Sequence, residues 1–212
     1  MHPQAARAMT IGAVGVGALI LAAAAARGDA PGGPEARAAI EICQRADTAA
    51  ADERAALLEA GLARAELAVA ANPQDPVAHF AIFCNLGRDL SHRSAWRLLG
   101  TLGDLRRARN AIDLALTLAP DYAPALAAKG AMLTQLPGML GGDRDEGIRL
   151  LLRAVALSPE DAILRLTLAE GLRAVGERDA ARVHAATAVT LLERAGPAQD
   201  LNSARALVAS VE

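Results

Sequence analysis

The side chains that could bind a metal ion or act as a nucleophile are few and scattered. Four histidines are present, and none has a second histidine or a cysteine at metal-ligand spacing: His2, His79, His92 and His184. Zinc sites need such clusters of ligands. No serine lies in the Gly-x-Ser-x-Gly sequence of an acyl-transfer nucleophile. The sequence therefore predicts no catalytic residue, no cofactor and no metal site.

Two short sequences resemble ion-binding or phosphate-binding loops but are incomplete. The acidic sequence at 143–146 resembles the start of a calcium loop, but Ile148 and Ala154 stand where an EF-hand needs Gly and Glu. We interpret these acids as the beginning of a helix. The glycine-rich sequence at 12–17 lies in an apolar leader and follows no expected strand, so we interpret it as a flexible part of an export segment.

The two cysteines, Cys43 and Cys84, leave three interpretations open. They could form a disulfide in an exported protein, remain as two separate buried thiols, or act as a redox pair. No Cys-x-x-Cys is present, which argues against a redox pair. The sequence does not fix the distance between them, and two separate buried thiols are favoured.

Three similar helical segments each end at a proline, namely Pro73, Pro120 and Pro159. Proline lacks the backbone N–H and disfavours the helical conformation of the residue before it. We therefore expect helices to stop at Asn72, Ala119 and Ser158. Upstream of each stop, apolar residues recur three and four positions apart, as on one face of a helix.

These segments resemble the tetratricopeptide repeat (TPR) family, in which about 34 residues form a helix pair. The prolines are farther apart than this period, which we attribute to insertions near 87–103 and 137–142. The final copy, with a turn at Gly176, needs no insertion. The resemblance implies an all-α, TPR-like α-solenoid of antiparallel helix pairs at 35–193, with a C-terminal capping helix at 194–212.

The first thirty residues differ from the rest of the chain. An uncharged apolar run at 9–26 is followed by a short linker at 31–34, and Ala24 and Ala26 supply an Ala-x-Ala cleavage sequence. We expect 1–30 to be a signal peptide or an N-terminal membrane anchor. The repeats would then lie outside the cytoplasm, in the periplasm or held at the inner membrane. The formal net charge of -2 gives no global attraction to nucleic acid.

The first insertion is basic. We interpret its arginines as a solvated helix face, and the alternative is a protruding docking site for an acidic partner or anionic lipid. That candidate basic protrusion consists of Arg93, Trp96, Arg97, Arg106 and Arg107.

The TPR resemblance also implies a partner groove lined by the first helix of each pair. In this register the groove residues are Phe80, Cys84, Arg88, Ala127, Ala131, Thr134, Gln135, Leu166, Glu170 and Arg173. The lysine and asparagine clamp of chaperone-binding TPR proteins is missing at these positions, so we do not expect chaperone C-termini as partners.

We therefore expect a non-catalytic protein-interaction or assembly scaffold that binds a protein or peptide partner. The alternative is a TPR accessory protein of a solute transport system, because the glycine-rich bend LPGMLGGD resembles that of the TPR component of TRAP-type transporters. A pocket lined by Phe80, Phe83 and Leu133, with one or two arginines, would favour this alternative. The identity of the partner and the oligomeric state do not follow from the sequence.

Overall fold

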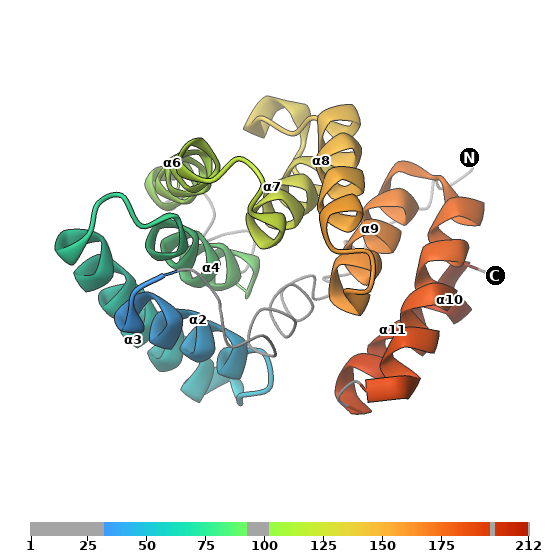
Figure 1. The fold of residues 1–212 in the computed structure, drawn as a ribbon, viewed down its shortest axis with the longest axis horizontal. Coiled ribbons are helices and arrows are strands. Elements are labelled where there is room, and N and C mark those ends of the chain that lie inside the picture. Colours follow the sequence, from blue (N-terminus) through green and yellow to red (C-terminus); the bar gives the residue numbers. More distant parts are fainter. Residues whose placement is uncertain (1–31, 93–101, 196–197, 212) are drawn as a thin grey trace, which may run out of the picture.

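The computed structural model describes residues 32–92, 102–195 and 198–211, and every regular element in these ranges is helical (Figure 1). The all-α prediction is confirmed. The predicted leader at 1–30, together with Arg93, Trp96 and Arg97, lies outside the described residues. The helices are α2 (Pro34–Ala46), α3 (Ala51–Ala71), α4 (Pro76–His92), α6 (Leu102–Leu118), α7 (Ala123–Gln135), α8 (Arg144–Leu157), α9 (Ala162–Val175), α10 (Arg178–Ala195) and α11 (Ala198–Val211), with a 3-10 helix η1 (Gly138–Leu140) between α7 and α8.

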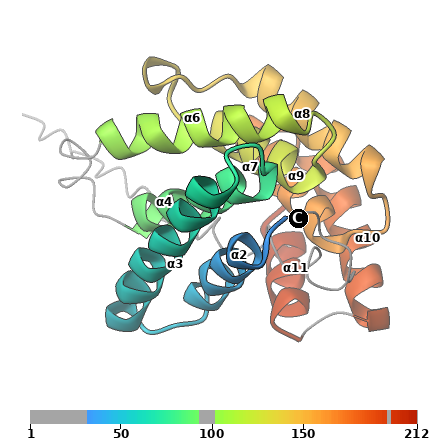
Figure 2. The ribbon, with the colours of Figure 1, turned by 60° about the vertical axis from the view of Figure 1, so that its left-hand side comes forward.

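Consecutive helices pack as pairs, and the pairs follow one another in an arc (Figures 1 and 2). The pairs are α2 with α3, α4 with α6, α7 with α8, and α9 with α10. Each pair also packs against the next one, and α11 packs against α10 at the end of the stack. This arrangement confirms the predicted TPR-like α-solenoid with a C-terminal capping helix.

The second helix of each of the first three pairs ends at its expected stop position. Asn72 and Ser158 are the C-caps of α3 and α8, and their backbone N–H groups donate to the carbonyls of Ala68 and Ala154. Ala119 follows the end of α6 and donates in the same way to Ala115. Proline comes next in each case and cannot continue the helix.

The first helix of the next pair begins three residues after the proline, so that its N-cap lies two residues after it. At α4, the Asp75 carboxylate accepts from the backbone N–H of Val77 at 2.8 Å, and at α9 the Asp161 carboxylate accepts from that of Ile163 at 2.9 Å. These are N-cap bonds, which satisfy backbone donors that the helix leaves open. Tyr122 occupies the same place before α7 and forms no side-chain cap. Its ring instead meets that of Phe80 edge-on, with centroids 5.3 Å apart.

The core is a series of three apolar clusters. The first is formed by α2, α3, α4 and α6 with part of α7, the second mainly by α7, α8 and α9, and the third by α9, α10 and α11. Leu116 packs against both the first and the second cluster. Gly130 and Gly147 bring α7 and α8 together so closely that an added Cβ on Gly130 would lie 2.7 Å from the Gly147 carbonyl oxygen. The small residues of the sequence thus allow tight helix contacts.

The connections after α2 and after α7 have different forms. The helix α2 ends at Ala46, and the carboxylate of the next residue, Asp47, binds Arg88 of α4. The bend between α7 and α8 has the expected form. Gly141 has a φ of 80°, and the Asp143 carboxylate caps α8. Glycine adopts such a left-handed conformation at little cost.

Candidate interaction surfaces

Most side chains expected to line the partner groove belong to the packed interior. Gln135 is exposed, and Glu170 and Arg173 are partly exposed. The expectation that the others face an open groove is corrected, because they contribute to packing in this conformation. The seven buried residues are Phe80, Cys84, Arg88, Ala127, Ala131, Thr134 and Leu166.

Close helix packing explains this burial. Phe80 lies in the first apolar cluster, Ala127 in the second and Leu166 in the third. The Thr134 methyl group lies against Gly147, where a Cβ on that glycine would come within 2.7 Å of it. Positions that would face a groove between more widely spaced helices therefore meet neighbouring helices. A partner site on the concave side stays a prediction that rests on the remaining positions.

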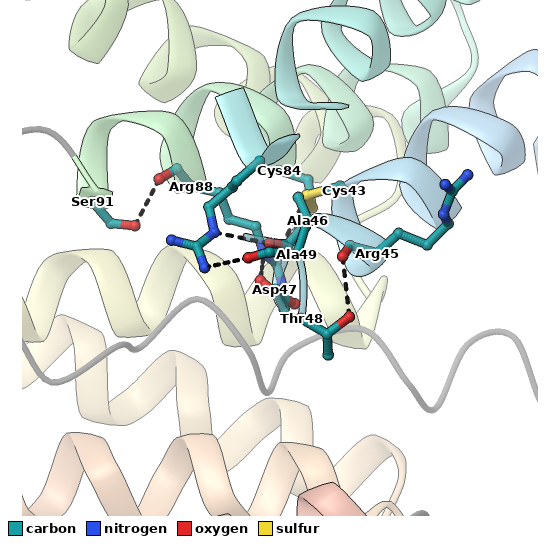
Figure 3. Close-up of polar contacts among 10 residues, drawn as sticks. Cys43, Arg45, Ala46, Asp47, Thr48, Ala49, Cys84, Arg88 and Ser91 are labelled. Carbon is teal, nitrogen blue, oxygen red and sulfur yellow. Dashed lines mark hydrogen bonds and ion pairs between the residues drawn. A yellow bond between two sulfur atoms is a disulfide. The ribbon is translucent and has the colours of Figure 1, made fainter. Parts of the chain in front are cut away.

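Cys43 and Cys84 form a disulfide that joins α2 to α4 (Figure 3). Their Cα atoms are 6.3 Å apart, within the usual range for a disulfide. Both residues are buried. The favoured expectation of two separate thiols is therefore wrong, because the first helices of successive pairs bring the two positions together.

A buried ion pair lies beside the disulfide. Two nitrogens of Arg88 bind the two carboxylate oxygens of Asp47, with Nε–Oδ1 at 2.5 Å and Nη2–Oδ2 at 2.7 Å (Figure 3). The remaining nitrogen, Nη1, lies 3.0 Å from Cys43 Sγ and 2.8 Å from Cys84 Sγ. Arg88 was expected in the groove, but all three of its nitrogens point toward α2 and the turn after it. The disulfide and the ion pair together fix α2 against α4.

A second group of polar side chains lies on α9 and α10, and its buried atoms are incompletely bonded. Three buried atoms have no hydrogen-bond partner among the described residues, namely Glu170 Oε2, Arg173 Nε and His184 Nδ1. Burial raises the pKa of Glu170 to about 7, although the charge of Arg173 lowers it in part. Burial also lowers the pKa of His184, and the charge of Arg165 acts in the same direction. Glu170 and Arg173 thus retain hydrogen-bonding capacity at predicted groove positions.

A hollow lined by residues of α6 and of the η1 turn is called the inter-repeat cleft from here on. Its volume is about 550 Å³. A smaller hollow of about 430 Å³ lies beside the same bend, around Pro137 and Arg144. The inter-repeat cleft is lined by Leu102, Leu105, Arg106, Arg109, Asn110, Asp113, Met139, Leu140 and Gly141.

Arg109 holds the two walls of the inter-repeat cleft together. Its Nη1 donates to the Leu140 carbonyl at 2.8 Å. The Arg109 guanidinium lies directly against Gly141, whose φ of 80° favours glycine, and a Cβ there would force the guanidinium to move. Nearby, Lys129 of α7 pairs with Asp113 of α6 at 2.6 Å. These contacts set the geometry of the cleft.

The described part of the candidate basic protrusion divides between two places. Arg106 is exposed and lines the inter-repeat cleft. Arg107 instead pairs with Glu66 of α3 on the surface. Arg106 was expected at an interaction site from the sequence, whereas the apolar residues Met139 and Leu140, which line the same hollow, were not.

The residues expected to form a small-molecule pocket do not line either hollow. Phe80 and Leu133 are buried in the core. The Phe83 ring stacks on Phe80, with centroids 6.4 Å apart. Within the described residues no group of three or more His, Cys, Asp or Glu side chains could hold a metal ion. In the same part of the chain no helix combines the length and apolarity that crossing a membrane requires.

Among known proteins, this chain is similar to solved structures of helical repeat proteins. No family model matches the sequence, and no curated protein matches it either. TTC0263, a thermophilic TPR protein of Thermus thermophilus, has a TM-score of 0.59 and 25% identity over 82% of this chain and 80% of that chain. The 41-end segment of MamA from Desulfovibrio magneticus RS-1 has a TM-score of 0.43 and 20% identity over 84% of this chain and 94% of that chain.

Proposed function

This chain is a tetratricopeptide-repeat protein, and we propose that it is a non-catalytic interaction scaffold on the extracytoplasmic side of a bacterial membrane. Stacked helix pairs of this kind present extended surfaces, and proteins with this fold generally use them to bind other proteins. The observation that supports this proposal most strongly is the solenoid itself, with an open cleft between two of its units.

The disulfide supports the location. Disulfides form and persist in oxidising compartments and are rare in the bacterial cytoplasm, where thiols are kept reduced. Cys43 and Cys84 are joined within the core of the first two helix pairs, where the bond has a structural role. The apolar run at 9–26 is the segment that would direct export.

The test uses the full chain with a C-terminal tag in a bacterial host. The cells are separated into periplasmic, membrane and cytoplasmic fractions, and free thiols are labelled with a maleimide polymer before and after reduction. We expect the chain in the periplasmic or membrane fraction, with both cysteines labelled only after reduction. A matched chain that lacks 1–30 should stay in the cytoplasm with labelled thiols.

Partner binding is tested in the same cells by chemical cross-linking, tag purification and mass spectrometry. We expect cross-links from the described surface of this chain to one defined protein of the cell envelope. A cytoplasmic, fully reduced chain would contradict the location. A correctly placed chain without any reproducible cross-linked partner would contradict the scaffold function.

A further inference from the structure

The two departures of this chain from the regular repeat length meet at the inter-repeat cleft. The first insertion, near 87–103, begins within α4 and ends at the start of α6, whose first residue is Leu102. The second insertion, at 137–142, lies between α7 and α8 and contains η1. Residues of both line the same hollow. The helix α6 and the turn between α7 and α8 lie side by side in both views (Figures 1 and 2). Two repeats without insertions would lack Leu102 and the η1 wall.

The cleft exposes large apolar side chains on its two walls. Met139 is 92% exposed and Leu102 is 51% exposed. Single exposed apolar residues are common on protein surfaces and need no explanation. These two, however, line one hollow, Leu102 from α6 and Met139 from η1, and the partly buried Leu105 and Leu140 line it as well. An apolar side chain bound in the hollow would therefore meet apolar residues of both elements.

The charge of the cleft is positive. Arg106 is exposed, and none of the described residues forms an ion pair or hydrogen bond with its side chain. Arg109 uses Nη1 for the Leu140 carbonyl and carries a second positive charge on the same helix face. The acidic residue of the cleft, Asp113, is paired with Lys129. A ligand with carboxylates would therefore be complementary to the positive charges of Arg106 and Arg109.

We propose that the inter-repeat cleft docks a short acidic segment of the partner protein. A large apolar side chain of that segment lies between Leu102 and Met139, and its carboxylates bind Arg106 and Arg109. This inference rests on the proposed scaffold function and places the contact at the edge of the solenoid, away from the first-helix positions that are buried. A hollow between two elements suits a protruding side chain better than the flat surface of a bilayer.

The experiment measures fluorescence anisotropy of a labelled probe peptide, acetyl-DELLDE-amide, titrated with the purified full chain. Two matched peptides, NQLLNQ and DESSDE, remove the charge and the apolar side chains in turn. Two cleft variants, Arg106→Glu and Met139→Ser, are compared with Arg194→Glu and Val183→Ser, which change exposed residues of α10 away from the cleft. Thermal melts confirm that all four variants are folded, as expected for exposed positions.

We expect saturable binding of DELLDE that weakens about tenfold in Arg106→Glu, because an attraction is replaced by a repulsion of similar size. Met139→Ser should weaken it about fivefold through lost apolar contact. Both α10 variants should bind as the unaltered chain does, and NQLLNQ and DESSDE should bind at least fivefold more weakly. Raising the salt concentration should weaken binding, since the charges are exposed.

Three results would overturn the proposal. The first is no saturable binding of the acidic probe, and the second is equal weakening in the α10 variants. The third is binding to phosphatidylglycerol vesicles that Arg106→Glu and Met139→Ser abolish, without peptide binding, which would assign the cleft to a lipid surface. In cells, a partner that still cross-links to the Arg106→Glu variant would refute the proposal that the cleft binds it, but would leave the proposed scaffold function intact. A chain that cross-links to no partner would refute the scaffold function itself.

Discussion

Removal of the Cys43–Cys84 disulfide should destabilise the first two helix pairs, and the size of the effect follows from the chain length that it closes. The two cysteines are separated by 41 residues. In the chain-entropy description, a cross-link over a loop of this length stabilises the fold by about 4 kcal/mol, and measured losses for native disulfides are about 2–5 kcal/mol. A Cys43→Ala, Cys84→Ala double variant also removes both sulfur contacts of Arg88, which acts in the same direction.

The assay is urea denaturation of the full chain followed by circular dichroism, with the double variant beside the unaltered chain under oxidising and reducing conditions. We expect the free energy of unfolding to fall by about 3–4 kcal/mol in the variant. Reduction of the unaltered chain should lower it similarly, while reduction of the variant should have no effect. This last comparison is the control for effects of the reductant itself.

Hydrogen exchange shows where the loss occurs. Each unit of a repeat stack contacts only its neighbours, so destabilisation should be concentrated in α2, α3 and α4. Amides of α10 should keep their protection or lose much less. Equal denaturation midpoints with and without the disulfide would refute this reasoning. A uniform loss of protection along the whole chain would refute the part that treats the units as separable.

Three further predictions test the packing and the charges. Ala154→Arg should lower the free energy of unfolding by about 3 kcal/mol or more, because Ala154 is fully buried in α8. The control, Arg153→Ala, removes one exposed ion pair and should cost less than about 1 kcal/mol. Equal, small shifts in the thermal melts of the two variants would contradict the predicted helix register. Arg88→Met should cost about 3–5 kcal/mol in urea denaturation, since the Asp47 carboxylate stays buried without its guanidinium, and a loss under about 1 kcal/mol would contradict that role. The pKa of Glu170 in the folded chain, about 7, lies above the ordinary value of 4.5, so the contribution of this residue to stability is full below pH 4.5 and is lost as the pH rises through 7. Glu170→Gln should remove up to about 3 kcal/mol of this pH dependence of the free energy of unfolding. Identical pH profiles of the two chains would show that the raised pKa of Glu170 is wrong.

The ends of the helices could be predicted because local chemistry sets them. Asn72, Ala119 and Ser158 each precede a proline, and the effect of proline on the residue before it does not depend on tertiary structure. The same holds for Asp143, whose carboxylate caps the helix that follows it. Together with the apolar spacing, these signals define the helix pairs and the solenoid.

The groove positions could not be predicted from the repeat pattern, because they depend on the distance between helices. Gly130 and Gly147 let α7 and α8 approach closely, and the side chain of Thr134 is enclosed in their contact. The pairing of Cys43 with Cys84 depends in the same way on how α2 lies against α4. Neither distance leaves a signal in the local sequence.

The position of the inter-repeat cleft, in contrast, follows from the sequence, because it depends on where the two insertions fall in the repeats. Both insertions fall in the same kind of connection, between the first and second helix of a pair, and the two pairs are consecutive. In a stack where each unit contacts its neighbours, equivalent connections of consecutive units lie side by side along one edge. Leu102 and Met139, which lie in different insertions, therefore had to come close. In a repeat protein, insertions at equivalent places in adjacent units create a surface that neither unit has alone. Two of the exposed large apolar residues, Leu102 and Met139, line this surface together with Arg106.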